Sequence, residues 1–179
     1  GDSITAGAFN DRDEGGSYHD IEDADRAYGP RLARALDADY SIIAKSGEGI
    51  AHNYDEDTLP YTGIHTADRY PGTFCQTDEP KDNPAWDASQ FPVDAVIVAM
   101  GTNDLLPEKP HASEEAFVAG YVRLLSVIRR VNPDAKIICL EPVPAYAGPT
   151  ASPWIEAAIR EREKAGDKGL YFLRLNADG

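Results

Sequence analysis

Residues 94–104 read DAVIVAMGTND, a run of apolar residues followed by a glycine and polar side chains. The apolar part, residues 94–100, is nearly continuous, which is typical of a strand buried on both faces of a parallel sheet. In open α/β sheets, functional sites form at the carboxyl ends of the strands. Residues 94–104 therefore predict a parallel sheet with a candidate site in Gly101-Thr102-Asn103-Asp104.

The clearest predicted helix follows at residues 113–131. Ser113 can cap its first turn, and Asn132-Pro133 stops it. Apolar residues recur along this segment at helical spacing, which predicts one buried face. That face consists of Phe117, Tyr121, Leu124, Leu125 and Ile128.

Other segments extend the alternation of strands and helices. Short apolar runs predict strands at residues 40–44 (YSIIA), 136–140 (KIICL) and 170–175 (LYFLRL). Helices are predicted at residues 28–38, with Leu32, Ala35 and Leu36 on one face, and at residues 152–165, with Pro153 in the first turn. This order predicts an α/β fold: a three-layer α/β/α sandwich around a central, mainly parallel sheet.

The chain length fits one domain, residues 1–179, and leaves little room for two. A parallel sheet needs a strand before its first helix, yet the sequence begins at Gly1-Asp2-Ser3. We therefore expect the first strand and a C-terminal element of the domain to lie outside these residues, so that the domain is truncated at both ends.

The charge of the chain limits its partners. It has 17 lysines and arginines against 31 aspartates and glutamates, a formal net charge of -14. Such a surface repels nucleic acid and anionic membranes, so neither is an expected partner. No segment approaches the roughly 20 apolar residues of a membrane span.

The chain has two cysteines, Cys75 and Cys139. Cys139 lies in an apolar run and is expected to be a small buried hydrophobic residue. A disulfide between the two is one option, which spacing alone does not decide. The cellular compartment therefore stays open, with secretion among the options.

Three loops at expected strand ends carry groups suited to acyl transfer. Ser3 lies on a strand-to-helix turn with its hydroxyl exposed, Gly47 lets a backbone N–H approach a substrate, and Asn103 can aim its side-chain amide at the same place. Acyl transfer through serine needs a nucleophile, a base and donors for the developing oxyanion. We predict Ser3 as the nucleophile, with the Ser3 N–H, the Gly47 N–H and the Asn103 side chain as the donors.

On these residues the chain resembles the SGNH hydrolase superfamily, also called GDSL esterases. Gly1-Asp2-Ser3 matches the nucleophile block, Ser46-Gly47 the glycine block and Gly101-Thr102-Asn103-Asp104 the asparagine block. The resemblance implies the SGNH-hydrolase (flavodoxin-like) fold and an oxyanion hole of Ser3, Gly47 and Asn103. No cofactor is expected, and no metal either, because no two histidines have the spacing of a metal site.

Within that superfamily the chain is most similar to carbohydrate esterase family 2, whose members remove acetyl groups from plant polysaccharides. The matching stretches are looser: Thr58-Leu59-Pro60, Trp86-Asp87, GTND at 101–104 and residues 117–140. The resemblance implies a serine esterase that acts on a small ester or an acetylated carbohydrate.

The base of the superfamily is a histidine in the loop after the last strand, often with an aspartate three residues before it. Here that loop is Asn176-Ala177-Asp178-Gly179, without a histidine, and Asp178 is best explained as an ordinary loop aspartate. We expect the base in residues beyond Gly179. The alternative is a catalytically inactive, carbohydrate-binding relative. The histidines that are present are expected on surface loops: His19, His52, His65 and His111.

The long polar segment 53–92 bears on the substrate. It is rich in Pro, Gly, Asp and Thr, and it is functional, inserted or partly helical. A lipid site has an apolar rim, so this segment favours sugar over the second candidate function, hydrolysis of lipid, thioester or other small esters. Tyr61, Tyr70 and Trp86 either stack on sugar rings or pack the segment onto the body.

Overall fold

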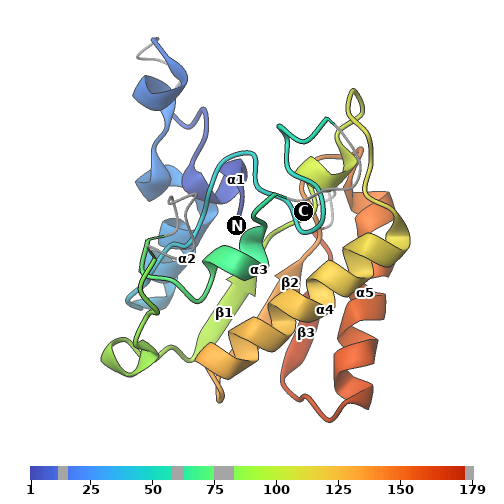
Figure 1. Cartoon of the computed structure of the whole chain (residues 1–179). Coiled ribbons are helices and arrows are strands. Elements are labelled where there is room, and N and C mark those ends of the chain that lie inside the picture. The colour runs from blue at the N-terminus through green and yellow to red at the C-terminus, as the bar shows by residue number, and fades with distance from the viewer. Residues whose placement is uncertain (12–15, 58–62, 75–82, 176–179) are drawn as a thin grey trace.

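The structure, a computed structural model, describes residues 1–11, 16–57, 63–74 and 83–175 of the chain. Its centre is a parallel three-stranded sheet in the order β1-β2-β3 (Figure 1). The strands are β1 (Ala95–Val98), β2 (Lys136–Leu140) and β3 (Leu170–Leu173). In their register, Ile137 lies opposite both Val96 and Leu170. Because all three strands run the same way, their carboxyl ends meet at one edge, which confirms the predicted α/β fold with a parallel sheet.

Two long helices, α4 (Glu114–Val131) and α5 (Gly148–Lys164), pack against each other and against the sheet (Figure 1). The predicted buried face of α4 is confirmed, since none of its five residues is more than 1% exposed. Ile137 and Cys139 of β2 complete this core and are fully buried. Cys139 is a free thiol, and its burial agrees with the prediction of a small buried hydrophobic residue. Cys75 lies outside the described residues.

The ends of the two helices follow different local signals. Ser113 caps α4 by accepting a hydrogen bond from the Ala116 N–H at 3.2 Å, as the sequence predicts. The prediction for α5 placed its start too late, because the helix begins at Gly148 and not at residue 152. Pro149, and not Pro153, occupies the first turn. Ser152 lies inside the helix, and its hydroxyl donates a hydrogen bond to Glu141.

The predicted strand at residues 40–44 is wrong. This segment forms no ladder with another described strand. The Gly1 N–H donates to the Ile43 carbonyl at 2.8 Å, and the Lys45 N–H donates to the Gly1 carbonyl at 3.1 Å. These bonds have the pattern of a single parallel pair, whereas a strand requires a run of such pairs. They nevertheless hold Gly1 beside residues 43–45.

The helix predicted at residues 28–38 is present as α2 (Tyr28–Leu36), but its buried face is not the predicted one. Leu32 and Leu36 are 40% and 67% exposed, and Ala35 is exposed as well, whereas Pro30 and Ala33 are buried. Helical spacing predicts which residues share a face, but a face is buried only where another element covers it. In the structure α2 contacts the short helix η3 (Ala24–Arg26), and the face that carries Leu32 and Leu36 stays exposed.

Six further helices in the described part of the chain have only three or four residues each. They are α1 (Ser3–Ala6), η2 (Tyr18–Ile21), η3 (Ala24–Arg26), α3 (Thr66–Arg69), η5 (Ala88–Gln90) and η6 (Asn103–Leu105). None of the helices in the described part of the chain is long and apolar enough to cross a membrane.

The long polar segment is partly helical, since it contains α3 and η5. Tyr70 packs onto the body: it is buried, and its hydroxyl accepts a hydrogen bond from Asn132 Nδ2 at 2.9 Å. Trp86 is 39% exposed, and Tyr61 lies outside the described residues. Of the two explanations for these aromatic residues, stacking on sugar or packing onto the body, packing is the one that holds for Tyr70.

Asp167 fixes the turn that leads into β3, at the end of the sheet opposite Gly101. Its side chain is 2% exposed and pairs with Arg129 Nε and Arg162 Nη2, each at 2.8 Å. Burial alone would raise the pKa of Asp167, but the two arginines lower it overall below the ordinary value of 3.8. A lowered carboxyl pKa contributes stability above pH 3.8 that is lost as the pH falls further.

Asp167→Asn is therefore expected to lower the free energy of unfolding by about 3 kcal/mol at neutral pH, because it leaves two largely buried arginines without their counter-charge. Urea unfolding measures this difference, which should shrink as the pH falls below 3.8, because Asp167 is then protonated first in the unfolded chain and only at lower pH in the folded protein. The control is Arg174→Met, which removes an exposed ion pair with Glu156 and should cost less than about 1 kcal/mol. An Asp167→Asn effect that is equal at neutral and acidic pH would contradict the explanation.

Candidate active site

Ser3 is the first residue of α1, directly after a buried aspartate. Asp2 caps the helix, with Oδ1 accepting a hydrogen bond from the Ile4 N–H at 3.0 Å, and Ser3 is half-buried. Burial raises the pKa of Asp2, against the Ile4 N–H and a hydrogen bond with the Thr102 side chain. The Asp2–Thr102 contact joins the loop of Ser3 to the loop that follows β1.

Gly47 lies on a turn that requires glycine. Its φ of +80° is in the left-handed region, where a side chain is strained, and its carbonyl accepts a hydrogen bond from the Tyr54 N–H at 2.8 Å. Ile43 and Lys45, shortly before Gly47 in the chain, are both hydrogen-bonded to Gly1. The Gly47 turn therefore lies close to the start of α1.

Asn103 opens η6, just beyond the carboxyl end of β1. Its side chain is buried, and Nδ2 donates a hydrogen bond to the Glu48 carbonyl at 2.7 Å. A side-chain amide carries two N–H donors, so this bond leaves a second one. Gly101 lets the chain before Asn103 pass close to Pro142 and Phe117, because a Cβ at this position would lie 3.0 Å from the first side chain and 3.3 Å from the second.

Asp104 connects the same loop to residues 50–52. It is fully buried, and its carboxylate accepts hydrogen bonds from the N–H groups of Ile50 at 3.0 Å, Ala51 at 2.7 Å and His52 at 3.1 Å. Burial raises the pKa of Asp104, while these N–H groups act in the opposite direction. Hydrogen bonds thus unite all three predicted loops, those of Ser3, Gly47 and Asn103.

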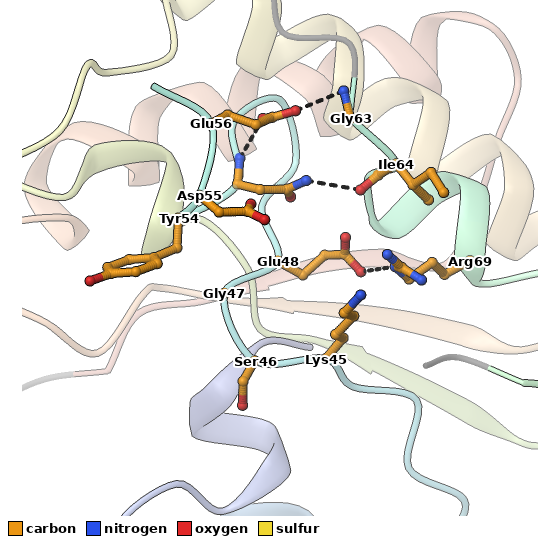
Figure 2. A pocket seen from close by; sticks show the side chains of 11 residues that line it. Lys45, Ser46, Gly47, Glu48, Tyr54, Asp55, Glu56, Gly63, Ile64 and Arg69 are labelled. Atoms are coloured by element: carbon orange, nitrogen blue, oxygen red, sulfur yellow. Dashed lines mark hydrogen bonds and ion pairs between the residues drawn. The ribbon is translucent and has the colours of Figure 1, made fainter. Parts of the chain in front are cut away.

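A cleft of about 500 Å³ opens beside Gly47 (Figure 2). Its lining includes an ion pair that sequence reasoning missed, Glu48 with Arg69 of α3, whose side chains are only 3% and 6% exposed. Burial raises the pKa of Glu48 to about 7, although Arg69 and Lys45 favour its charged form. No local pattern could reveal this pair, because Arg69 lies in a short helix within a polar segment.

Tyr54 forms part of the cleft wall next to Gly47. It is 55% exposed, and the Lys109 ammonium lies 5.0 Å from its ring centroid. The cleft thus combines charged and polar groups with one partly exposed aromatic ring at its edge (Figure 2). Sequence reasoning singled out Tyr61, Tyr70 and Trp86 instead, because nothing in the local sequence distinguishes Tyr54.

The prediction that His52 lies on the surface is wrong. It is fully buried, with Nδ1 3.3 Å from the Asn103 carbonyl oxygen and Nε2 2.6 Å from that of Glu56. Both contacts are to main-chain atoms, which a side-chain pattern does not reveal. His65 and His111 are also engaged, with Glu56 and with the Leu106 carbonyl.

A base for Ser3 is not found in the described part of the chain. No histidine whose side chain is described there hydrogen-bonds to Ser3, and Asp178 lies outside it. Across the described ranges there is likewise no group of three or more metal-ligating side chains.

Near the N-terminus, the acidic residues Asp11 and Asp23 form ion pairs with Arg26.

Curated proteins with similar sequences are carbohydrate-active enzymes. The chain is 31% identical to the cellulase/esterase CelE of Acetivibrio thermocellus over 97% of its own length and 20% of that protein. It is 29% identical to an acetylxylan esterase/glucomannan deacetylase of Cellvibrio japonicus, over 79% of the chain and 37% of that protein. The chain therefore spans well under half the length of these relatives.

Solved structures give the same picture of the fold. A family two carbohydrate esterase from Clostridium thermocellum in complex with cellohexaose matches with a TM-score of 0.77 and 28% identity, over 97% of this chain and 51% of that one. A family two carbohydrate esterase from Cellvibrio japonicus matches with a TM-score of 0.81 and 24% identity, over 97% and 50%. The chain thus spans about half of these structures, and the predicted resemblance to family 2 carbohydrate esterases is confirmed.

The sequence profile of the GDSL-like lipase/acylhydrolase family matches residues 1–175, nearly the whole chain. This match begins at the Gly1-Asp2-Ser3 turn and includes both loops that are hydrogen-bonded around it. The chain belongs to the GDSL-like lipase/acylhydrolase family.

Proposed function

We propose that this chain is part of a serine esterase that removes acetyl groups from carbohydrate. Ser3 is the nucleophile, and the Ser3 N–H, the Gly47 N–H and the Asn103 side chain stabilise the oxyanion. The observation that carries the proposal is the hydrogen bond from Asn103 Nδ2 to the Glu48 carbonyl, together with the bonds of Gly1 to residues 43–45. These contacts support convergence of the three loops on one reacting centre.

The mechanism follows from these roles. The Ser3 Oγ attacks the ester carbonyl carbon, its proton passes to a base, and negative charge develops on the carbonyl oxygen. The three donors stabilise that charge where it forms. The C–O bond to the sugar then breaks, and the sugar hydroxyl leaves with the proton from the base. Water next attacks the acetyl-enzyme, releases acetate and restores the Ser3 hydroxyl. The base is not among the described side chains, and we propose that another part of the natural protein supplies it.

The cleft beside Gly47 favours a sugar as the alcohol portion of the ester. Its lining carries Lys45, Glu48, Asp55 and Arg69, together with the exposed ring of Tyr54. A site for a long acyl chain would not be lined by this many charged side chains. The relatives named as acetylxylan esterases and glucomannan deacetylases support the same substrate class.

The test of the function is substrate preference in the natural full-length protein. Acetate release from acetylated xylo- or manno-oligosaccharides is compared with hydrolysis of p-nitrophenyl acetate and p-nitrophenyl octanoate. We expect both acetyl substrates to be hydrolysed and the octanoate to react at least about tenfold more slowly, because an enzyme built for acetyl groups offers the longer acyl chain no apolar pocket. Preference for octanoate would favour the lipid hydrolase instead. Binding of oligosaccharide without hydrolysis would indicate the inactive, carbohydrate-binding relative.

Tyr54→Ala is expected to raise KM for acetylated oligosaccharide about fivefold, because it removes an aromatic face beside the reacting centre. KM for ethyl acetate should change less than about twofold, since that ester has neither a sugar ring nor an aromatic ring to lie on the tyrosine. Tyr54→Phe keeps the ring and serves as the control, with KM values close to wild type. Equal losses on both substrates in Tyr54→Ala would show that the ring acts on the loop and not on the sugar.

A further inference from the structure

The short helix α3 holds the loop that carries Gly47 at two neighbouring residues. The Thr66 N–H and hydroxyl both donate to the Gly49 carbonyl, at 3.4 and 3.2 Å. One residue earlier in the loop, the Glu48 carboxylate pairs with Arg69 at the other end of α3 (Figure 2). Main-chain and side-chain contacts from one helix thus fix residues 48 and 49 together.

Glu48 is also bonded to the candidate oxyanion hole. Its carbonyl accepts the hydrogen bond from Asn103 Nδ2 at 2.7 Å, and the residue before it is Gly47. The side chain of Glu48 therefore faces Arg69, while its main chain contacts both candidate donors. A displacement of Glu48 would move Gly47 and Asn103 relative to each other.

An ion pair is an unusual way to attach a helix to a loop. Desolvation of both charges costs much of what their attraction returns, so an apolar pair of similar volume holds two elements together as well or better. What an arginine–carboxylate pair adds is direction, because a planar guanidinium meets a carboxylate in only a few orientations. Resting on the proposed function, we propose that Glu48 and Arg69 are positioning residues that keep the Gly47 N–H and the Asn103 amide at the separation that the oxyanion needs.

The test uses the natural full-length protein with p-nitrophenyl acetate, a substrate too small to report on sugar binding. Arg69→Met and Glu48→Gln each break the pair, Arg69→Lys keeps its charge, and the double variant Glu48→Met/Arg69→Met replaces the pair by apolar contact. Asp167→Asn is the control for stability, because it breaks a buried ion pair at the opposite end of the sheet. For each variant, kcat, KM and urea unfolding are measured.

Arg69→Met and Glu48→Gln are expected to lower kcat about 10- to 100-fold with KM changed less than about threefold, since misplaced donors weaken transition-state stabilisation and not substrate binding. Arg69→Lys should recover part of kcat. The double variant should regain the stability of the wild type but not its kcat. Amide hydrogen exchange at residues 46–50 should be faster in Arg69→Met and unchanged in Asp167→Asn.

The outcomes separate this inference from the function on which it rests. Ser3-dependent hydrolysis with a wild-type kcat in Arg69→Met or in the double variant overturns the positioning role alone. Unchanged exchange at residues 46–50 in Arg69→Met also overturns it, and so does a loss of kcat no larger than that of Asp167→Asn. Hydrolysis that does not depend on Ser3 overturns the proposed function and this inference with it.

Discussion

Replacement of Ser3 by alanine is expected to lower kcat for p-nitrophenyl acetate at least about 10⁴-fold in the natural full-length protein. The variant keeps the oxyanion donors but has no oxygen that can form the acetyl-enzyme, so only the residual catalysis of binding and charge stabilisation remains. KM should change little, because the serine hydroxyl contributes to the reaction and not to holding the ester.

Two measurements distinguish this loss from unfolding. Ser3 is half-buried at the start of a four-residue helix, so Ser3→Ala should change the free energy of unfolding by less than about 1 kcal/mol. A fluorophosphonate should add its phosphonyl group to the wild type and not to the variant, as seen by intact-mass spectrometry. The control is Ser126→Ala, because the Ser126 hydroxyl bonds only within α4 and lies outside the candidate site. Turnover in Ser3→Ala equal to that of Ser126→Ala would refute the nucleophile assignment.

The sequence predicts best those elements whose signal is local. The apolar face of α4 and the run that becomes β2 are visible in the residues themselves, because each buries the side chains that its own spacing brings to one side. Residues 40–44 carry an equally apolar run but form no strand, since a strand exists only through its hydrogen-bonded neighbours. Leu32 and Leu36 are exposed for a related reason: their burial depends on another element and not on their spacing.

The candidate site divides in the same way. The sequence could single out Ser3, Gly47 and Asn103 as candidates because each stands in a recognisable turn or loop, although only the loop of Asn103 follows a strand of the described sheet. His52 and the Glu48–Arg69 pair could not, since their partners are main-chain carbonyls or a residue in a four-residue helix without readable periodicity. The sequence thus predicts candidate reacting groups, and the structure adds the residues that contact their loops.

Asp104→Ala is expected to cause the largest loss of stability among these variants, about 4 kcal/mol. The substitution removes the only carboxylate that satisfies the N–H groups of Ile50, Ala51 and His52 in the described part of the chain, where Asp104 is fully buried. Each buried donor left without an acceptor costs about 1–3 kcal/mol, and alanine leaves all of them without one. Urea unfolding measures the difference, with Asp94→Ala as the matched control, because Asp94 is exposed at the other end of β1.

Asp104→Asn tests whether the same carboxylate also serves the reaction. The amide keeps one acceptor oxygen but turns an NH₂ group toward N–H donors, so its stability should lie between those of the wild type and Asp104→Ala. Asp104 bonds residues 50–52 to the loop of Asn103, so kcat for p-nitrophenyl acetate should fall in the same order, wild type, then asparagine, then alanine, at temperatures where all three are folded. Stability equal to that of Asp94→Ala would show that the backbone N–H groups find other acceptors. Equal kcat values in the wild type, Asp104→Asn and Asp104→Ala would show that Asn103 keeps its position without the carboxylate. The hydrogen bond from Asn103 to Glu48 would then be sufficient to hold it.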